Sequence, residues 1–129
     1  MNIENLDKLI AHMRTLEFVP IPADFLFGSP FPQDGFNMLF YENECGTPMC
    51  IAGHACKLSD PLRVIGPAHA AEWLELDYSW ALDNLFSPYT TRLLYNEITL
   101  EQAIAALERV RAAGWDYQLM GTHEVWGLE

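Results

Sequence analysis

The residues best suited to chemistry lie together in the stretch Cys45–Cys56, which reads CGTPMCIAGHAC. All three cysteines of the chain and one of its four histidines fall within it. The spacing Cys45-x4-Cys50-x3-His54-x-Cys56 suggests thiolate and imidazole ligands for zinc. On a helix, residues four apart share a face, whereas residues two apart point about 200° away from each other. The candidate metal or thiol site is therefore Cys45, Cys50 and His54, without Cys56.

Two kinds of chemistry are open to these three residues. A closed zinc site needs a fourth ligand, which would come from His12, His69, His123 or a carboxylate. A nucleophilic thiol is the other option, because the start of a helix lowers a thiol pKa, and a Cys45–Cys50 disulfide is also conceivable. A catalytic cysteine needs a base that a third group orients, and no such group is evident, so we predict no catalytic residue and no cofactor.

A structural interpretation of the same stretch is favoured over both. Thr47 suits an N-cap and Pro48 the first turn of a helix. The residues that follow are small or apolar nearly all round, which is typical of a buried central helix. His54 is then expected to be a core or rim histidine with a hydrogen-bond partner.

The whole chain, residues 1–129, is predicted to form a single compact domain. We expect it to be mostly α, with four to five helices. Helical periodicity predicts a first helix over 2–15, with Asn2 as its cap and a Glu4–Lys8 pair. Pro67 opens a second candidate over 67–76, and a short helix over 80–86 follows. A capping box of Thr99 and Gln102 begins the clearest helix, which Gly114 ends. We expect the aromatic tail after it to pack back on the core.

Residues 18–36 hold four prolines and five phenylalanines. Prolines at this density exclude a regular helix, so this Pro/aromatic-rich segment is expected to be extended. Residues 37–41 are a strand candidate, and the pattern allows a small β-hairpin.

Charge limits the classes of partner. The chain carries 18 Asp and Glu against 7 Lys and Arg, a formal net charge of −11. Such a chain repels phosphates, so direct nucleic-acid binding is disfavoured and a basic protein is the easier partner. One acidic stretch free of Lys and Arg lies between Arg63 and Arg92. Its carboxylates are the predicted partner-binding residues: Glu72, Glu75, Asp77 and Asp83.

The sequence shows no targeting signal and none of the common catalytic motifs. The first residues lack the apolar segment of a signal peptide, and no apolar run reaches the roughly 20 residues of a membrane span. An odd cysteine number fits reduced thiols, so a cytoplasmic location without membrane association is expected. There is no P-loop, GxGxxG, HExxH or GxSxG motif, which removes the commonest enzyme signatures.

The central stretch resembles the C-G-T-x-x-C-x-A-G-x-A signature of small uncharacterised proteins of bacteria and their phages. The likeness extends over roughly residues 36–115 and includes Leu85-Phe86 and the ITLEQAIAAL run at 98–107. The resemblance implies no activity, so it assigns no catalytic residue. The matching residues form a structural motif: Cys45, Gly46, Thr47, Cys50, Ala52, Gly53 and Ala55.

These patterns together predict a small acidic protein-interaction module, phage-encoded and inhibitory, that binds a basic, nucleic-acid-handling protein. The first alternative is a metal- or thiol-dependent site at Cys45, Cys50 and His54. The second is a structural subunit of a larger particle. The oligomeric state does not follow from the sequence.

Overall fold

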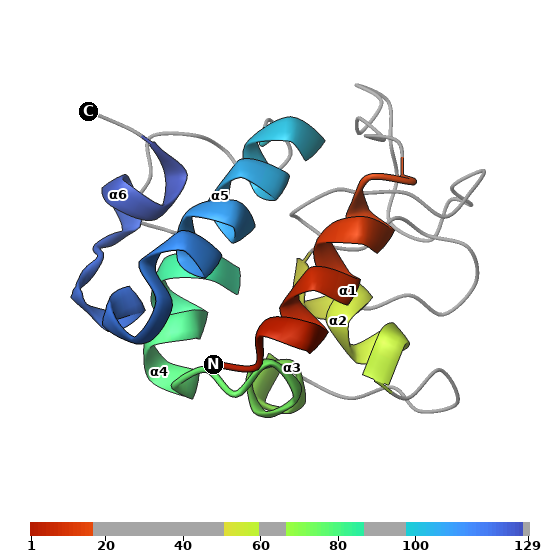
Figure 1. Cartoon of the computed structure of the whole chain (residues 1–129), viewed down its shortest axis with the longest axis horizontal. Helices are drawn as coiled ribbons and strands as arrows, with labels where there is room; N and C mark the ends of the chain where they lie inside the picture. The colour runs from red at the N-terminus through yellow and green to blue at the C-terminus, as the bar shows by residue number, and fades with distance from the viewer. Residues whose placement is uncertain (17–50, 60–66, 87–97, 128–129) are drawn as a thin grey trace, which may run out of the picture.

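The computed structural model describes residues 1–16, 51–59, 67–86 and 98–127, and these residues are mostly helical with no strand among them. The mostly α prediction is confirmed, while the proposed strand at 37–41 and the extended segment at 18–36 lie outside the described residues. The described residues form six α-helices, which Figure 1 labels: α1 (Ile3–Met13), α2 (Ile51–Ser59), α3 (Pro67–Leu74), α4 (Tyr78–Ala81), α5 (Leu100–Ala113) and α6 (Thr122–Trp126). A π-helical turn, η1 (Leu82–Phe86), continues α4, and a 3₁₀ helix, η3 (Gly114–Leu119), follows α5.

The first helix and α5 begin where their capping residues predicted. The Asn2 side chain accepts a hydrogen bond from the Asn5 amide at 3.0 Å. The Thr99 hydroxyl accepts from the Gln102 amide at 3.1 Å, and the Gln102 side chain accepts in return from the Thr99 amide at 2.8 Å. Both caps satisfy amides that a helix start leaves without intrahelical partners.

The second and third predicted helices are present with shifted ends. α3 begins at Pro67 as predicted but ends at Leu74, two residues early. The third starts at Tyr78 rather than at 80, because the Asp77 side chain accepts from the Trp80 amide and serves as the N-cap. Its last five residues widen into the π-turn η1.

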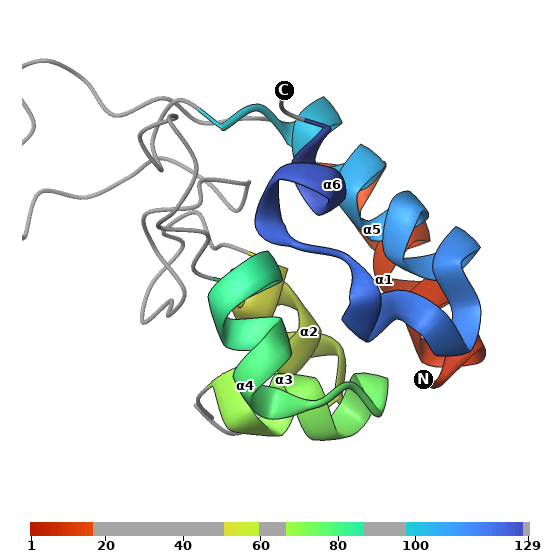
Figure 2. The ribbon, with the colours of Figure 1, turned by 90° about the vertical axis from the view of Figure 1, so that its left-hand side faces the viewer.

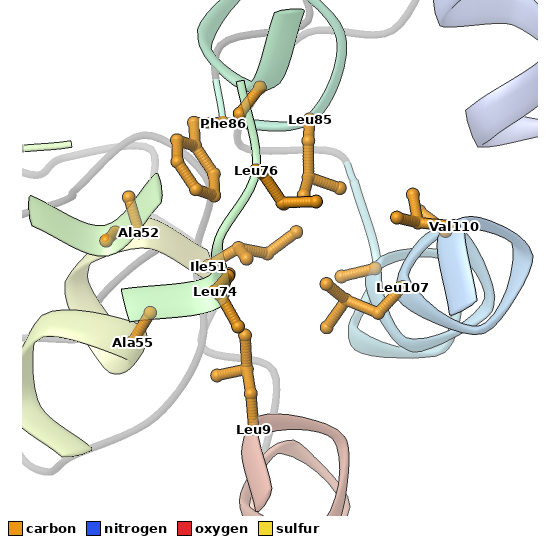
Figure 3. Close-up of a cluster of buried hydrophobic side chains, with 14 of the residues drawn as sticks. Leu9, Ile51, Ala52, Ala55, Leu74, Leu76, Leu85, Phe86, Leu107 and Val110 are labelled. Atoms are coloured by element: carbon orange, nitrogen blue, oxygen red, sulfur yellow. The ribbon is translucent and has the colours of Figure 1, made fainter. Parts of the chain in front are cut away.

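One continuous core joins the helices. In Figure 3 side chains converge from α1, α2, η1 and α5, together with Leu74 and Leu76 at the end of α3. Leu9, Ile51 and Leu107 are each fully buried in it. Figures 1 and 2 both place α1 beside α5, and α2 next to α3, with α4 continuing from α3. Helices this short depend on burial of their apolar faces for most of their stability.

The tail packs back on the core through Tyr117 and Trp126, and it forms η3 and α6. Two side chains of α6 donate hydrogen bonds to Asn84 in η1. The Trp126 indole donates to the Asn84 carbonyl at 2.8 Å, and the Thr122 hydroxyl donates to the Asn84 side chain at 2.7 Å. Gly127 closes α6 with φ +66°, and a Cβ there would lie 2.6 Å from the Arg109 guanidinium. The backbone angle therefore favours glycine at position 127, and a larger residue would also displace the Arg109 side chain.

Candidate functional site

The structure describes only part of the central motif. Cys45, Gly46, Thr47 and Cys50 lie outside the described residues, so the three-residue metal or thiol site stays a prediction. The motif residues that are described all lie on α2 and are buried: Ala52, Gly53 and Ala55. Every residue of α2 from Ile51 to Cys56 is buried. The prediction that this helix is a central buried one is confirmed for those residues.

His54 meets a second histidine. Its side chain is only 1% exposed, and its Nδ1 lies 3.1 Å from Nε2 of His12, in the last turn of α1. The two ring centroids are 5.1 Å apart and the planes are inclined by 54°. As a hydrogen bond, this contact has one imidazole donating and the other accepting. His54 is thus a core histidine with a hydrogen-bond partner, as the structural interpretation predicted.

Cys56 faces away from that histidine pair. Its thiol is buried against α3, where burial raises its pKa above the ordinary value and a hydrogen bond from the Ala70 backbone amide partly offsets the rise. A raised pKa keeps the thiol protonated and unreactive at neutral pH. The opposite directions of His54 and Cys56 follow from their two-residue spacing on a helix.

The other predicted fourth ligands lie elsewhere. Nε2 of His69 is 2.8 Å from the Ser59 hydroxyl, which itself donates to the Cys56 carbonyl. His123 is exposed on α6. Among the described residues, no three of His, Cys, Asp and Glu come together as a metal-ligand set. His12 is the predicted fourth ligand that the fold brings to His54.

Two regions of the described residues differ in charge, and α2 with its exposed Lys57 belongs to neither. The balanced region is residues 1–16 and 98–113, which hold α1 and α5. It carries four carboxylates and four Lys or Arg. The carboxylates are Glu4, Asp7, Glu101 and Glu108, and the cations are Lys8, Arg14, Arg109 and Arg111.

The balanced region uses most of these charges internally. The Arg111 guanidinium donates two hydrogen bonds to the Asp7 carboxylate, at 2.5 and 3.2 Å. This hydrogen bonding holds the pKa of Asp7 below its usual value. Arg14 bonds Glu108 at 2.7 Å. These four side chains line a groove of about 430 Å³ between α1 and α5. The groove therefore already holds equal numbers of opposite charges.

The acidic region is residues 67–86 and 114–127, which hold α3, α4, η1, η3 and α6. It has no Lys or Arg. Its six carboxylates are all exposed: Glu72, Glu75, Asp77, Asp83, Asp116 and Glu124. The sequence identified the first four; it missed Asp116 and Glu124, because only the folded chain brings the tail alongside α4.

Side chains that are partly or wholly buried hold the two halves of the acidic region together. The Trp80 indole donates to the Met120 carbonyl at 3.0 Å, and its ring meets Tyr117 edge-on at a centroid distance of 4.8 Å. The Tyr117 hydroxyl in turn accepts from the Asp77 amide at 2.7 Å. The Asp77 backbone is thereby joined to the turn that carries Asp116.

Glu75 occupies an unusual backbone position. Its φ is +53°, in the left-handed region that glycine usually fills at a helix end. The Glu75 amide bonds the Glu72 carbonyl at 3.0 Å, and the Leu76 amide bonds the Ala71 carbonyl at 2.9 Å. This pair of bonds is the Schellman motif that terminates α3. A glutamate there costs backbone free energy that glycine would not.

Two apolar side chains of η3 are the most exposed large hydrophobics in the described part of the chain. Trp115 is 88% exposed and Leu119 is 81% exposed. Sequence reasoning expected the tail aromatics to pack on the core, and Tyr117 and Trp126 do. Trp115 does not, and no pattern in the tail distinguished it beforehand.

Comparisons with protein-family models, with curated proteins and with solved structures found no match to this chain. The likeness to a bacterial and phage signature therefore stays a prediction from the motif. Among the described residues, no helix is long and apolar enough to cross a membrane.

Proposed function

We propose that this protein is a small acidic interaction module, phage-encoded and inhibitory, that binds a basic, nucleic-acid-handling protein through its acidic region. The observation that supports this most is the contrast in charge use. Carboxylates of the balanced region are largely engaged by Arg and Lys, whereas the six of the acidic region have no Lys or Arg in that region to pair with. A surface of one sign steers and holds a partner of the opposite sign.

Glu75 adds support from stability. An exposed residue in the left-handed conformation lowers the stability of the fold without contributing to the core. Strain of this kind is common where a side chain serves function. A negative charge at the end of α3, beside Glu72 and Asp77, contributes to the binding surface that we propose.

The experiment compares two variants of equal net charge. The acidic-region variant is Glu72→Gln, Glu75→Gln, Asp77→Asn and Asp83→Asn; asparagine still caps α4 at position 77. The balanced-region variant is Glu4→Gln, Asp7→Asn, Glu101→Gln and Glu108→Gln. Each neutralises four carboxylates, which moves the formal charge from −11 to −7. Circular dichroism checks that both still fold.

Each tagged protein is then used to capture partners from bacterial lysate, at low and at high salt, with identification by mass spectrometry. We expect the wild type and the balanced-region variant to capture the same basic, nucleic-acid-handling protein at low salt and to lose it at high salt. The acidic-region variant should capture much less of it. Equal capture by both variants, or capture that salt leaves unchanged, would contradict the proposal.

A metal site is a second candidate function, and the histidine pair favours it. Two imidazole nitrogens bound to one tetrahedral zinc at 2.0–2.1 Å lie about 3.3 Å from each other. The observed 3.1 Å between His12 and His54 is close to that spacing. Cys50 and Cys45 are the sequence-predicted thiolate ligands, and they lie outside the described residues.

The test is the metal content of protein purified without added zinc. A site of this kind predicts one zinc per chain, which Cys50→Ser and His12→Gln each remove. Cys56→Ser is the matched control and should keep the metal, because Cys56 faces α3. Metal-free protein whose thiols react slowly would exclude this candidate.

A further inference from the structure

η3 presents a rigid apolar pair to solvent. In a 3₁₀ helix three residues make one turn, so residues three apart lie on the same ridge. Trp115 and Gln118 form one ridge, Asp116 and Leu119 form the next, and Tyr117 points inward. The exposures agree, because Tyr117 is 5% exposed while Trp115 and Leu119 are 88% and 81% exposed. The two apolar side chains lie roughly 8 Å apart along the axis, at about 2 Å per residue.

The turn that carries them is held firmly. Tyr117 packs its ring against Trp80, and its hydroxyl accepts hydrogen bonds from the Asp77 amide and from the Gln118 side chain. Met120, directly after the turn, accepts from the Trp80 indole. A surface that is already ordered loses little conformational entropy when a partner binds. Trp115 and Leu119 are therefore placed as anchor residues of an interface would be, and tryptophan is enriched among such anchors.

The charges around the pair select the kind of partner. Asp116 lies between Trp115 and Leu119 in sequence, and residues 114–127 contain no Lys or Arg. The nearest preceding cation, Arg111, is held by Asp7 on α1. An exposed indole attracts a guanidinium or ammonium group over its face, and neighbouring carboxylates strengthen that attraction. A second copy of this chain would instead bring carboxylates against carboxylates.

We propose that Trp115 and Leu119, with Asp116 between them, form a docking patch for a basic amphipathic helix of the partner protein. Apolar residues of that helix pack on Leu119 and on the indole edge, and its Arg or Lys side chains cover the indole face and meet the carboxylates of the acidic region. This inference rests on the proposed function and names the part of the partner that the acidic region receives.

The probes are three synthetic helical peptides. The first carries Leu at i, i+3, i+4 and i+7 with Lys and Arg elsewhere; the second replaces Leu by Ser; the third replaces Lys and Arg by Gln. Binding is followed by tryptophan emission, because docking moves an exposed indole out of water and shifts its emission to the blue. Trp80 and Trp126 are buried already, whereas Trp73 is half-buried. The Trp115→Phe variant therefore shows whether the shift comes from Trp115.

We expect only the first peptide to bind tightly and to shift the emission. Trp115→Ala should weaken binding about thirtyfold and Leu119→Ser about tenfold, the range of interface anchors, with the salt dependence unchanged. The matched control is Ile3→Ser, because Ile3 is a 38% exposed hydrophobic residue in the balanced region. It should bind like the wild type.

Four results would overturn the docking patch. Salt-dependent binding that Trp115→Ala and Leu119→Ser leave unchanged rejects the patch while the acidic module stands. Equal binding of the Leu-free peptide rejects it in the same way. Self-association that Trp115→Ala abolishes, seen by sedimentation, makes a second copy the occupant. No salt-dependent binding of either basic peptide rejects the patch and the proposed function together.

Discussion

The balanced region and the acidic region share one core yet use their charges in opposite ways. In the balanced region, Arg111 on α5 binds Asp7 on α1, and Arg14 at the end of α1 binds Glu108 on α5. In the acidic region many contacts within the fold are made by neutral groups, such as the indoles of Trp80 and Trp126. One cation from α5 also contacts it, because the Arg109 guanidinium donates to the Val125 carbonyl of α6 at 3.0 Å. None of its carboxylates forms an ion pair with a described residue, and the Asp77 side chain caps α4. This difference is the observation that supports the proposed partner-binding role of the acidic region.

The largest predicted effect on stability concerns Trp80, which joins the two halves of the acidic region. Trp80→Ala should lower the free energy of unfolding by about 3–5 kcal/mol, because it removes a buried ring together with its packing on Tyr117. Trp80→Phe keeps a ring but leaves the Met120 carbonyl without its donor, at about 1–2 kcal/mol. Urea denaturation measures both. A Trp80→Ala protein as stable as the wild type would show that the two halves are not joined as described.

A smaller effect of opposite sign is expected at Glu75. Glu75→Gly should raise the free energy of unfolding by about 0.5–1 kcal/mol, because glycine adopts positive φ without steric cost. Glu75→Gln is the control, since it removes the charge but keeps the side chain in the same backbone conformation. Gains of equal size in both variants would mean that charge repulsion, and not the backbone, limits stability there.

Single carboxylates in the two regions should also differ. Glu108→Gln removes the partner of Arg14 and should cost about 0.5 kcal/mol, which is typical of an exposed ion pair. Glu124→Gln in the acidic region breaks no ion pair with a described residue and should be neutral or slightly stabilising. Thermal unfolding at low salt compares them. Destabilisation by Glu124→Gln that equals the cost at Glu108 would remove the distinction between the regions.

The smallest effect concerns pH. The hydrogen-bonded Arg111 holds the pKa of Asp7 below its ordinary value of 3.8. The folded state therefore gains stability from this pair above the unfolded-state pKa and loses it as pH falls through the lower, folded-state pKa. Wild type should exceed Asp7→Asn slightly in melting temperature at pH 6, and the difference should shrink as the pH falls below the ordinary pKa of 3.8. A difference that grows on acidification would have the wrong sign.

Local patterns in the sequence predicted much of the fold. Asn2, Thr99 with Gln102, and Pro67 marked helix starts correctly, because caps act within one turn of the chain. The small residues of α2 predicted burial, and two-residue spacing predicted that His54 and Cys56 diverge. These inferences depend only on short-range geometry.

Features set by tertiary contact were not predictable. The π-turn at η1 forms where α6 supplies donors to the Asn84 backbone and side chain. His12 and His54 are 42 residues apart in sequence, and no sequence pattern predicts their contact. His12 was one of several candidates for the fourth zinc ligand. Asp116 joined the acidic residues, and Trp115 stayed exposed, only because Tyr117 binds beside Asp77.

The most direct test of the account is the salt dependence of binding to the basic amphipathic peptide, measured by calorimetry for the two variants of equal net charge. If the acidic region holds the partner, its variant should bind about tenfold more weakly, with a flatter dependence of log Kd on log salt concentration. The balanced-region variant should match the wild type in both. Equal weakening and equal flattening in the two variants would show that net charge alone attracts the peptide, and would contradict the account.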